Sequence, residues 1–351
     1  MTPNIVDVHS HLYPPAYIDL LRARKDPPRI TGERGFERFV LFAEEARTGG
    51  GRRIDATYWD VEEKLAFMDR YGIDQSVISV GNPWLDPIAP EEARDLSRQL
   101  NRDLGRLEEQ TGGRLCGLGI LPSQNLSDAL AVAREVAGTA ELHGVVTSLR
   151  PCGYRLDDPA LEPLWGLLEE TRLPVFLHPH YGSAIEELTG FGHSLQVGIA
   201  FPAETTVAVA RMVFAGVLAR FQNLKVMVAH GAGTLPYLAG RLDAAWRSDP
   251  STHERLPHPP SRDLAKLYAD AVLYHPGAMR AAADVVGTAK LMFGTDHPFS
   301  IAEPLTNLEA ARAVFDDAEL ASVMARAAQS FFRLPEVDDR VFASRIASGE
   351  N

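Results

Sequence analysis

Eight short apolar runs recur along this chain, and longer amphipathic segments separate them. This alternation is typical of βα units whose strands form a parallel sheet. The runs cover residues 4–11, 75–80, 115–121, 144–150, 174–178, 225–230, 267–274 and 290–295. Eight such strands with helices between them predict an α/β fold of the (β/α)8 TIM-barrel type rather than an open sheet.

Two stretches of the chain are longer than a barrel connection requires. Residues 22–58 contain two consecutive prolines and a run of three glycines, and residues 181–206 contain further glycines and a proline. We expect both as loop insertions over the C-terminal face of the barrel, where they are candidate lids. Residues 1–336 are expected to form a single domain, followed by a charged C-terminal tail over residues 337–351.

The first apolar run contains a motif with metal-binding potential, Asp7-Val8-His9-Ser10-His11. Successive side chains of a strand point to opposite faces, so residues 7, 9 and 11 project together. Two imidazoles two residues apart on a strand can both reach one divalent cation, and such nitrogen ligands suit zinc, manganese or iron. The remaining ligands must then come from other strands.

Further histidines and a carboxylate stand where later runs end. His178 ends the fifth run, His230 ends the sixth, and Asp296 follows the eighth. A lone histidine is usually a packing residue, but several histidines at the carboxyl ends of barrel strands favour a metal site. Three histidines and this aspartate would leave room for water or substrate, which a catalytic metal needs.

Charge and cysteine content argue against several classes of partner. The formal net charge of −12 disfavours nucleic-acid and acidic-membrane partners, because both require basic surface. The two cysteines, Cys116 and Cys152, have no CxxC spacing and indicate reduced thiols in a reducing compartment. The N-terminus has no basic segment followed by an apolar one, and no later stretch reads as a membrane span. We therefore expect a cytoplasmic protein.

Five longer motifs carry a resemblance to a known family. They are NPW at 82–84, FLHPHYG at 176–182, FPAETTVAVARM at 201–212, AHGAGTLPYLAGR at 229–241 and LMFGTDHPF at 291–299. With the His-x-His pair, they make the chain resemble the amidohydrolase superfamily, and within it the aminocarboxymuconate-semialdehyde decarboxylase group. The resemblance is strongest to the isoorotate (5-carboxyuracil) decarboxylases. It extends over almost the whole chain, from residue 4 to about residue 335.

The resemblance implies a mononuclear metal centre. It implies one divalent ion, with zinc expected and manganese as the alternative, held by His9, His11, His178 and Asp296. His230 would stand beside the ion without necessarily binding it. Many members of the superfamily hold a second metal through a carboxylated lysine at the end of the fourth strand, and residues 144–150 contain no lysine.

The resemblance also implies an activity, the non-oxidative decarboxylation of a small aromatic, heteroaromatic or unsaturated carboxylic acid. A proton would reach the carbon before carbon dioxide leaves, with Asp296 as the donor and His230 as the polarising or relaying group. A metal-dependent hydrolase of an amide, lactone or related carbonyl compound is the alternative. There Asp296 would take the proton from metal-bound water and His230 would steady the oxyanion. A non-catalytic binding protein is a third reading, which loss of a ligand would support, and every ligand is present.

Arginines near the expected site favour an acidic small-molecule substrate, because a guanidinium group binds a carboxylate through two N–H groups. Arg52 resembles the substrate arginine of the isoorotate enzymes, with Arg53 as an alternative. Arg241 stands where the related semialdehyde decarboxylases present an arginine across a dimer interface. A homodimer or higher homo-oligomer is therefore expected.

Three further residues are expected at the substrate pocket. Asn82 would follow the second strand, and Phe299 follows the aspartate of the eighth. Arg150 ends the fourth strand, at a point where the isoorotate enzymes carry a loop of small residues. This cation could bind a substrate charge or pair with a neighbouring carboxylate.

Overall fold

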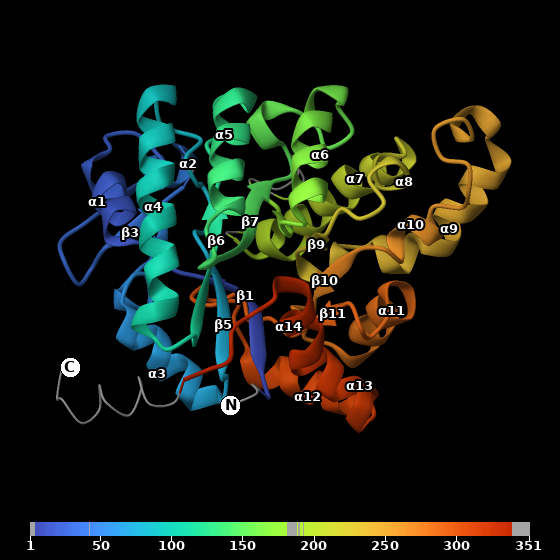
Figure 1. The fold of residues 1–351 in the computed structure, drawn as a ribbon. Coiled ribbons are helices and arrows are strands. Elements are labelled where there is room, and N and C mark those ends of the chain that lie inside the picture. Colours follow the sequence, from blue (N-terminus) through green and yellow to red (C-terminus); the bar gives the residue numbers. More distant parts are fainter. Residues whose placement is uncertain (1–3, 42, 181–187, 189, 192, 339–351) are drawn as a thin grey trace.

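The computed structural model describes residues 4–41, 43–180, 188, 190–191 and 193–338. Its centre is an eight-stranded parallel sheet (Figure 1). In spatial order the strands are β1 (Val6–His11), β5 (Gln75–Ser79), β6 (Leu115–Ile120), β7 (Leu142–Ser148), β8 (Val175–His178), β9 (Val226–Val228), β10 (Tyr268–Asp270) and β11 (Leu291–Met292). Backbone hydrogen bonds from Val8 to Phe293 and from His11 to His297 join the last strand to the first. The predicted (β/α)8 barrel is confirmed.

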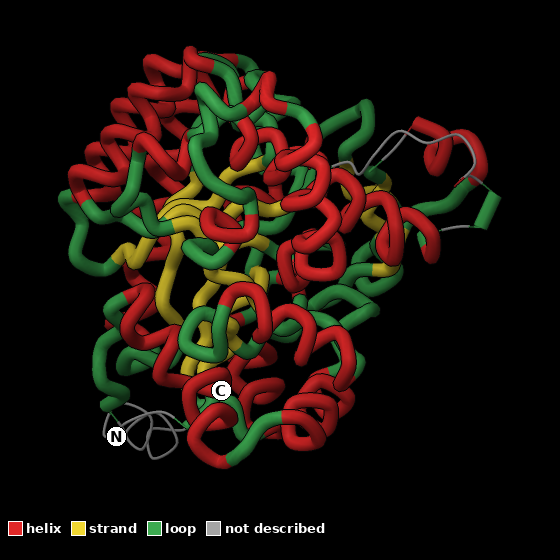
Figure 2. Tube along the Cα trace, turned by 90° about the vertical axis from the view of Figure 1, so that its right-hand side faces the viewer, coloured by secondary structure: helices red, strands yellow, loops and turns green. Residues whose placement is uncertain are grey.

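Helices connect consecutive strands or follow the last strand, and together they surround the barrel (Figure 2). They are α1 (Pro15–Ala23), α3 (Val61–Tyr71), α4 (Pro90–Gln110), α5 (Leu126–Ala137), α6 (Glu162–Thr171), α7 (Phe201–Phe214), α8 (Val217–Arg220), α9 (Leu235–Ser248), α10 (Ser261–Leu264), α11 (Pro276–Val286), α12 (Pro304–Val314), α13 (Asp317–Ala321) and α14 (Ala327–Phe332). Local signals fix several ends: Asp60 caps α3 by accepting from the Glu62 amide, and Gly72 ends it in the left-handed conformation.

The last three strands are shorter than their apolar runs. Strand β9 ends at Val228, β10 at Asp270 and β11 at Met292, and the apolar residues that follow belong to loops. In β10 the reason is visible, because the Asp270 carboxylate accepts the backbone N–H of Val272 at 3.0 Å and turns the chain away from the sheet. The shortening places loop residues, rather than strand residues, around the mouth of the barrel.

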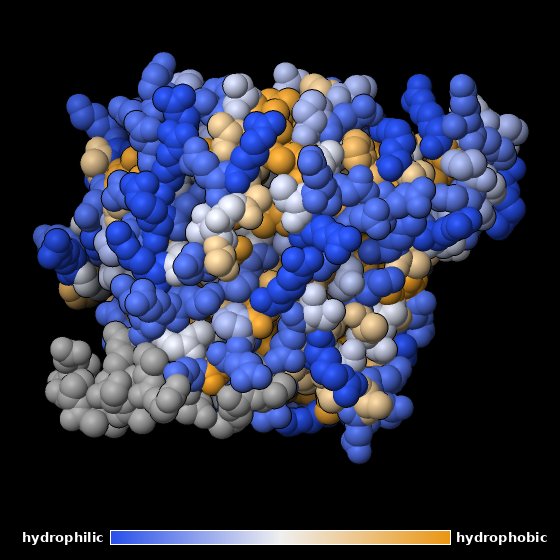
Figure 3. All heavy atoms as spheres, in the orientation of Figure 1, coloured by the Kyte–Doolittle hydropathy of each residue, from blue (hydrophilic) through white to orange (hydrophobic). Residues whose placement is uncertain are grey.

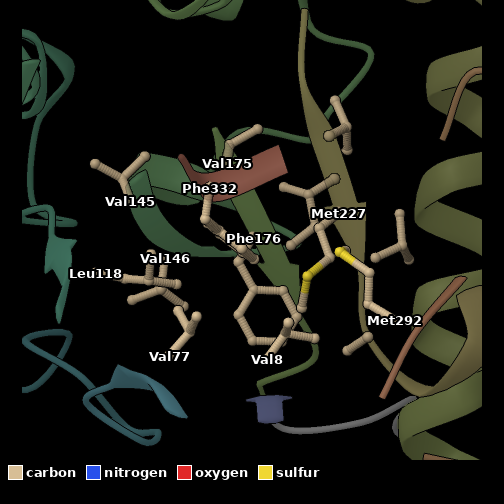
Figure 4. Packing of buried hydrophobic residues seen from close by; sticks show 14 of the residues in the cluster. Val8, Val77, Leu118, Val145, Val146, Val175, Phe176, Met227, Met292 and Phe332 are labelled. Atoms are coloured by element: carbon tan, nitrogen blue, oxygen red, sulfur yellow. The ribbon is translucent and has the colours of Figure 1, made fainter. Parts of the chain in front are cut away.

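The interior of the barrel is packed with apolar side chains. Figure 4 shows Val8, Phe176, Met227 and Met292 gathered in one cluster, and each is at most 1% exposed. The Phe176 ring lies 4.9 Å from the His9 ring, between ring centroids. The core therefore forms a rigid floor directly beneath the C-terminal ends of the strands, where the candidate site lies.

The first insertion forms a small antiparallel sheet beside the barrel. Its strands are β2 (Arg29–Thr31), β3 (Arg38–Val40) and β4 (Arg52–Arg53), with helix α2 (Ala43–Thr48) and the 3-10 turn η1 (Ala56–Tyr58) beside them. Residues 181–187, 189 and 192 of the second insertion lie outside the described residues, as do residues 339–351 of the expected tail. The two insertions meet where His193 Nε2 lies 2.8 Å from Glu45 Oε1.

One helix is long and apolar enough to cross a membrane by length and composition alone. It covers Gln196–Phe214, comprising the π-helical turn η5 (Gln196–Ala200) and α7. It stands between β8 and β9 as the connecting helix of a βα unit, and 28% of its most apolar window is buried. The face of the molecule in Figure 3 is mostly hydrophilic, with apolar atoms visible between the helices.

Candidate active site

Four side chains with metal-ligating atoms converge at the C-terminal mouth of the barrel. His9 and His11 lie on β1, His178 ends β8, and Asp296 lies in the loop after β11. Their ligand atoms all lie within 4.8 Å of one another, and the exposed fraction of each residue is 5% or less. These are the four residues that the sequence placed in a metal site.

The hydrogen bonds of the histidines fit a metal ion between them. His9 Nδ1 donates to Asp270 Oδ2 at 2.7 Å, His11 Nδ1 contacts Ser79 Oγ at 3.0 Å, and His178 Nδ1 donates to the Pro179 carbonyl at 2.7 Å. Asp296 Oδ1 lies 3.2 Å from His9 Nε2 and 3.3 Å from His11 Nε2, yet neither it nor the Nε2 atom of any of the three histidines makes a well-formed hydrogen bond, and all four atoms are buried. Buried polar atoms are rarely left unpaired, so three nitrogens and one oxygen facing each other are the donor set of a divalent metal ion.

Burial and the neighbouring charges hold most of these side chains in the protonation state that binds a cation. Burial lowers the pKa of His11 to about 4 and that of His178 well below its usual value, so both rings are neutral near pH 7. Burial acts to raise the pKa of Asp296, but His9 and the other nearby histidines hold it well below its usual value. Asp296 is therefore ionised, as a metal ligand must be.

His9 differs from the other ligands because two carboxylates flank it. Burial acts to lower its pKa, but the charges of Asp296 and Asp270 raise it to about 10. A metal ion must therefore displace a proton from His9 before its Nε2 can bind.

Asp7 does not join the ligand group, although it was expected on the same face as His9. The pairing of β1 with β5 shifts register between Asp7 and Ser10. The Asp7 carboxylate accepts the hydroxyl of Thr295 at 2.6 Å and the Thr295 amide at 3.1 Å. It thereby fixes the loop that carries Asp296, whose own amide donates to the His9 carbonyl at 2.7 Å.

His230 stands beside the ligand group in a short 3-10 turn, η6 (His230–Ala232), just after β9. Its backbone has a positive φ of 55°, and its amide donates to Asp270 Oδ2 at 2.9 Å. Its Nε2 lies 3.6 Å from Asp296 Oδ2, and 14% of its side chain is exposed. His230 is therefore close enough to Asp296 to exchange a proton after a small movement.

Asp270 is a site residue that the sequence analysis did not single out. It is fully buried and accepts hydrogen bonds from the His9 ring and from the amides of His230 and Gly231. Burial acts to raise its pKa, but His9 holds it below the usual value. The sequence signal that could have identified Asp270 is its position as the single carboxylate inside the apolar run 267–274, because a buried charge needs polar partners.

Arg52 and Phe299 lie together next to the metal group. The Phe299 ring centroid is 5.0 Å from that of His11, and the Arg52 guanidinium carbon lies 4.4 Å from the Phe299 centroid. Two Arg52 nitrogens, Nε and Nη2, are buried without a hydrogen-bond partner. A half-buried guanidinium with two buried nitrogens that lack partners offers a binding position for a carboxylate.

The other predicted substrate residues lie at different distances from this group. Asn82 is buried at the end of β5, where its side chain donates to the His180 carbonyl at 2.8 Å and so supports the backbone after β8. Arg150 is exposed after β7, and Arg241 is exposed on α9. Within this chain's described contacts, neither arginine has a side-chain interaction with the metal group.

The His180 ring stacks near Trp84, with centroids 4.8 Å apart, and its Nε2 lies 2.6 Å from Asp86 Oδ2. Trp84 also meets His178 edge-on, with centroids 5.8 Å apart. These contacts form one wall of the site beside the candidate metal ligand His178. Trp84 and Asp86 carry no spacing signal that would mark them as site residues.

The chain belongs to the amidohydrolase family, whose model matches residues 6–334. It is 27% identical over 308 residues to 2-amino-3-carboxymuconate-6-semialdehyde decarboxylase from Dictyostelium discoideum, a match that covers 85% of this chain and 82% of the relative. It is 32% identical to the solved apo structure of IDCase from Metarhizium anisopliae, with a TM-score of 0.88 and coverage of 96% and 98%. The resemblance to the semialdehyde and isoorotate decarboxylases is confirmed.

A solved structure of 5-carboxyvanillate decarboxylase from Novosphingobium aromaticivorans, with bound manganese, has a TM-score of 0.73 and 18% identity. It covers 94% of this chain and 97% of that one. At this identity the likeness concerns the fold alone. The named relatives at higher identity are decarboxylases, which supports decarboxylation over hydrolysis as the activity of this barrel.

Proposed function

We propose that this protein is a metal-dependent carboxy-lyase that decarboxylates a small aromatic, heteroaromatic or unsaturated carboxylic acid without oxidation. The observation that carries the proposal is the convergence of four buried ligand atoms that make no well-formed hydrogen bond, together with the free N–H groups of Arg52 near Phe299. A carboxylic acid can satisfy the guanidinium and a metal at the same time. The relatives named above support the reaction class.

His9, His11, His178 and Asp296 would hold the divalent ion, which supplies a Lewis acid that polarises substrate oxygens. Arg52 binds the substrate carboxylate and orients it, and the Phe299 ring packs under the guanidinium. The proton goes to the carbon that bears the carboxylate. The bond between that carbon and the carboxyl carbon then breaks, carbon dioxide leaves, and the electron pair returns to the unsaturated system.

Asp296 and His230 are the proposed proton carriers. Asp296 is ionised at rest because nearby histidines lower its pKa, so it must acquire a proton before it can give one to carbon. His230 Nε2, 3.6 Å from Asp296 Oδ2 and partly open to solvent, is placed to supply that proton. Asp296 then delivers it and returns to the carboxylate form.

Zinc is the proposed metal, with manganese as the alternative. Three imidazole nitrogens favour zinc. The alternative is based on the solved 5-carboxyvanillate decarboxylase structure of similar fold, which contains manganese. We further propose a cytoplasmic location and a single domain over residues 1–336. The two cysteines of the chain, both free, suit a reducing compartment.

We also propose a homodimer that buries the exposed apolar face of α7 and α9. Val207 on α7 is 59% exposed and Tyr237 on α9 is 86% exposed, and the hydroxyls of Thr206 and Thr234 join the two helices at 2.9 Å. Arg241 follows Tyr237 by one helical turn, so both lie on one side of α9. A second copy seated on this face would cover Tyr237, and Arg241 could then reach the partner's pocket.

Carbon dioxide release over a panel of acids tests the activity. The panel would contain 5-carboxyuracil, hydroxybenzoates, 5-carboxyvanillate and muconate semialdehydes. Amides and lactones would be assayed for hydrolysis in parallel. We expect release from at least one acid, with loss of bound metal and of release in His178→Ala. Metal-replete protein that hydrolyses an amide or lactone, and decarboxylates nothing, would overturn the proposal.

Light scattering with size exclusion tests the dimer. Tyr237→Arg should shift the protein toward a monomer, whereas Tyr154→Arg, at another exposed aromatic outside α7 and α9, should not. A wild-type protein that is monomeric throughout the micromolar range would contradict the dimer without affecting the decarboxylase assignment.

A further inference from the structure

A second group of metal-ligating side chains lies outside the active site, toward the N-terminal ends of the barrel strands. Cys116 is the second residue of β6, His143 is the second residue of β7, and Glu108 lies in the last turns of α4. One ligand atom from each lies within 4.8 Å of the others. Cys116 is fully buried and His143 is 8% exposed, so two strands and a helix hold the three side chains in place.

The surrounding contacts orient these donors toward one another. His143 Nδ1 contacts the Phe332 carbonyl at 3.3 Å, which leaves Nε2 facing Glu108 Oε2 at 2.5 Å. Cys116 Sγ lies 3.5 Å from the Gly113 carbonyl and 3.5 Å from Gln75 Nε2. Gln75 is 0% exposed, and its side-chain oxygen, Oε1, has no hydrogen-bond partner. A sulfur, a nitrogen and a carboxylate oxygen therefore lie together, and the amide nitrogen of Gln75 contacts the sulfur.

We propose that Cys116, His143 and Glu108 bind a second zinc ion, separate from the catalytic centre. The ligand set is thiolate, imidazole and carboxylate, which zinc accepts and which balances its two positive charges. A water molecule would take the fourth tetrahedral position. The thiolate makes this site selective for zinc and cadmium over manganese, because manganese prefers harder oxygen ligands.

Binding at this site must release the thiol proton. Burial raises the pKa of the Cys116 thiol well above its usual value, and the Glu108 charge acts in the same direction. The zinc ion replaces that proton on sulfur, so at least one proton leaves for each ion bound and affinity rises with pH. Glu108, with 23% of its side chain exposed, is the member of the group in contact with solvent.

The location suggests a structural role rather than a catalytic one. Gln75 Nε2 also donates to the Pro335 carbonyl at 3.2 Å, and the Asp338 amide donates to the Gly112 carbonyl at 2.8 Å. The residues after α14 therefore pack against the same strand ends that hold the proposed ion. An ion here would tie α4, β6 and β7 together next to this C-terminal segment and raise the thermal midpoint of unfolding.

Cadmium titration of the full-length His178→Ala variant tests the proposal, because cadmium bound to thiolate has a characteristic ultraviolet charge-transfer absorption. The catalytic site contains no sulfur, so it cannot produce this signal. We expect the band to saturate near one equivalent, to persist in Cys152→Ser and to disappear in Cys116→Ser. Zinc should suppress the band and manganese should not.

A second variant keeps the test decisive if Cys116→Ser does not fold. Glu108→Gln changes a partly exposed side chain, retains the thiol, and should weaken cadmium binding by about tenfold or more. Zinc added to the His178→Ala protein should also raise its thermal midpoint, and Glu108→Gln should reduce that rise. Two outcomes would overturn the proposal. One is the absence of the thiolate band in both wild-type and His178→Ala protein. The other is a band that disappears in Cys152→Ser but is unchanged in Cys116→Ser and Glu108→Gln.

Discussion

Asp270 Oδ2 accepts a hydrogen bond from His9 Nδ1 at 2.7 Å. The same oxygen accepts the backbone N–H of His230 at 2.9 Å. One buried carboxylate therefore orients a proposed metal ligand and also positions the turn that carries the proposed proton relay. Such partners of a ligating histidine set its tautomer and raise its basicity.

Asp270→Asn should weaken metal binding by about 10- to 100-fold while the barrel stays folded, because the amide is a poorer partner for the His9 ring. Metal affinity would be measured by competition with a chromophoric chelator, and folding by circular dichroism. Asp263→Asn is a matched control, since Asp263 is also fully buried but pairs with Lys266 at 2.7 Å. An Asp270→Asn protein with wild-type metal affinity would contradict the assigned role.

His230→Asn should retain metal and lose turnover by about 100-fold or more, because the side chain no longer carries a proton to Asp296. Metal content and carbon dioxide release would be measured on the same preparation. Loss of metal together with activity would instead identify His230 as a ligand. Unchanged turnover with metal retained would exclude a proton role.

Metal affinity of the metal-free protein should rise with pH. The pKa of His9 is raised to about 10, so its ring is protonated near neutral pH and the proton must leave when the ion binds. For one released proton the apparent affinity should rise about tenfold per pH unit between about pH 6 and about pH 8. Calorimetric titrations in several buffers would measure both the slope and the proton release. An affinity that does not change with pH would contradict the charged state of His9.

Lys64→Met should lower the free energy of unfolding by about 1 to 3 kcal/mol, since it removes a hydrogen-bonding amine from a buried polar cluster. Lys64 is 0% exposed, and its Nζ donates to Ser10 Oγ at 2.8 Å and contacts the His297 ring. The nearby Asp7 carboxylate would stay buried and would lose its favourable interaction with Lys64. Urea denaturation would measure the change, with Lys25→Met, at an exposed position, as the control. A midpoint shift no larger than that of the control would contradict this prediction.

Gly294→Ala should weaken metal binding by about tenfold or more. An added methyl group would lie 2.9 Å from His9 Cβ and 3.0 Å from Val272 Cγ2, so β1 or the loop after β10 must shift. Gly166→Ala is the control, because a methyl group there would lie 3.8 Å from the Phe221 ring, an ordinary contact. Equal metal affinity in the two variants would show that His9 tolerates the displacement.

The barrel could be predicted from sequence because each strand has its own local signal. The runs that became β1, β5, β6, β7, β8 and β9 match their strands to within about two residues at each end. The runs that became β10 and β11 extend four and three residues past the strand ends, because apolar residues in the following loops look the same as strand residues. Only hydrogen bonds such as that from Val272 to Asp270 decide where those strands stop.

The fold class and the four candidate metal ligands can be predicted from sequence, because each ligand stands at or just after the end of an apolar run and barrel topology brings the strand ends together. The partners of those ligands depend on contacts between distant segments. Asp270 is separated from His9 by 261 residues in the chain, and the side-chain spacing that marks a strand carries no information on such a contact. Asp7 illustrates the same limit, because a register shift in β1 turned it from an expected neighbour of the ligands into the support for Thr295. Packing and pairing between distant segments fix these relationships, and local sequence pattern does not.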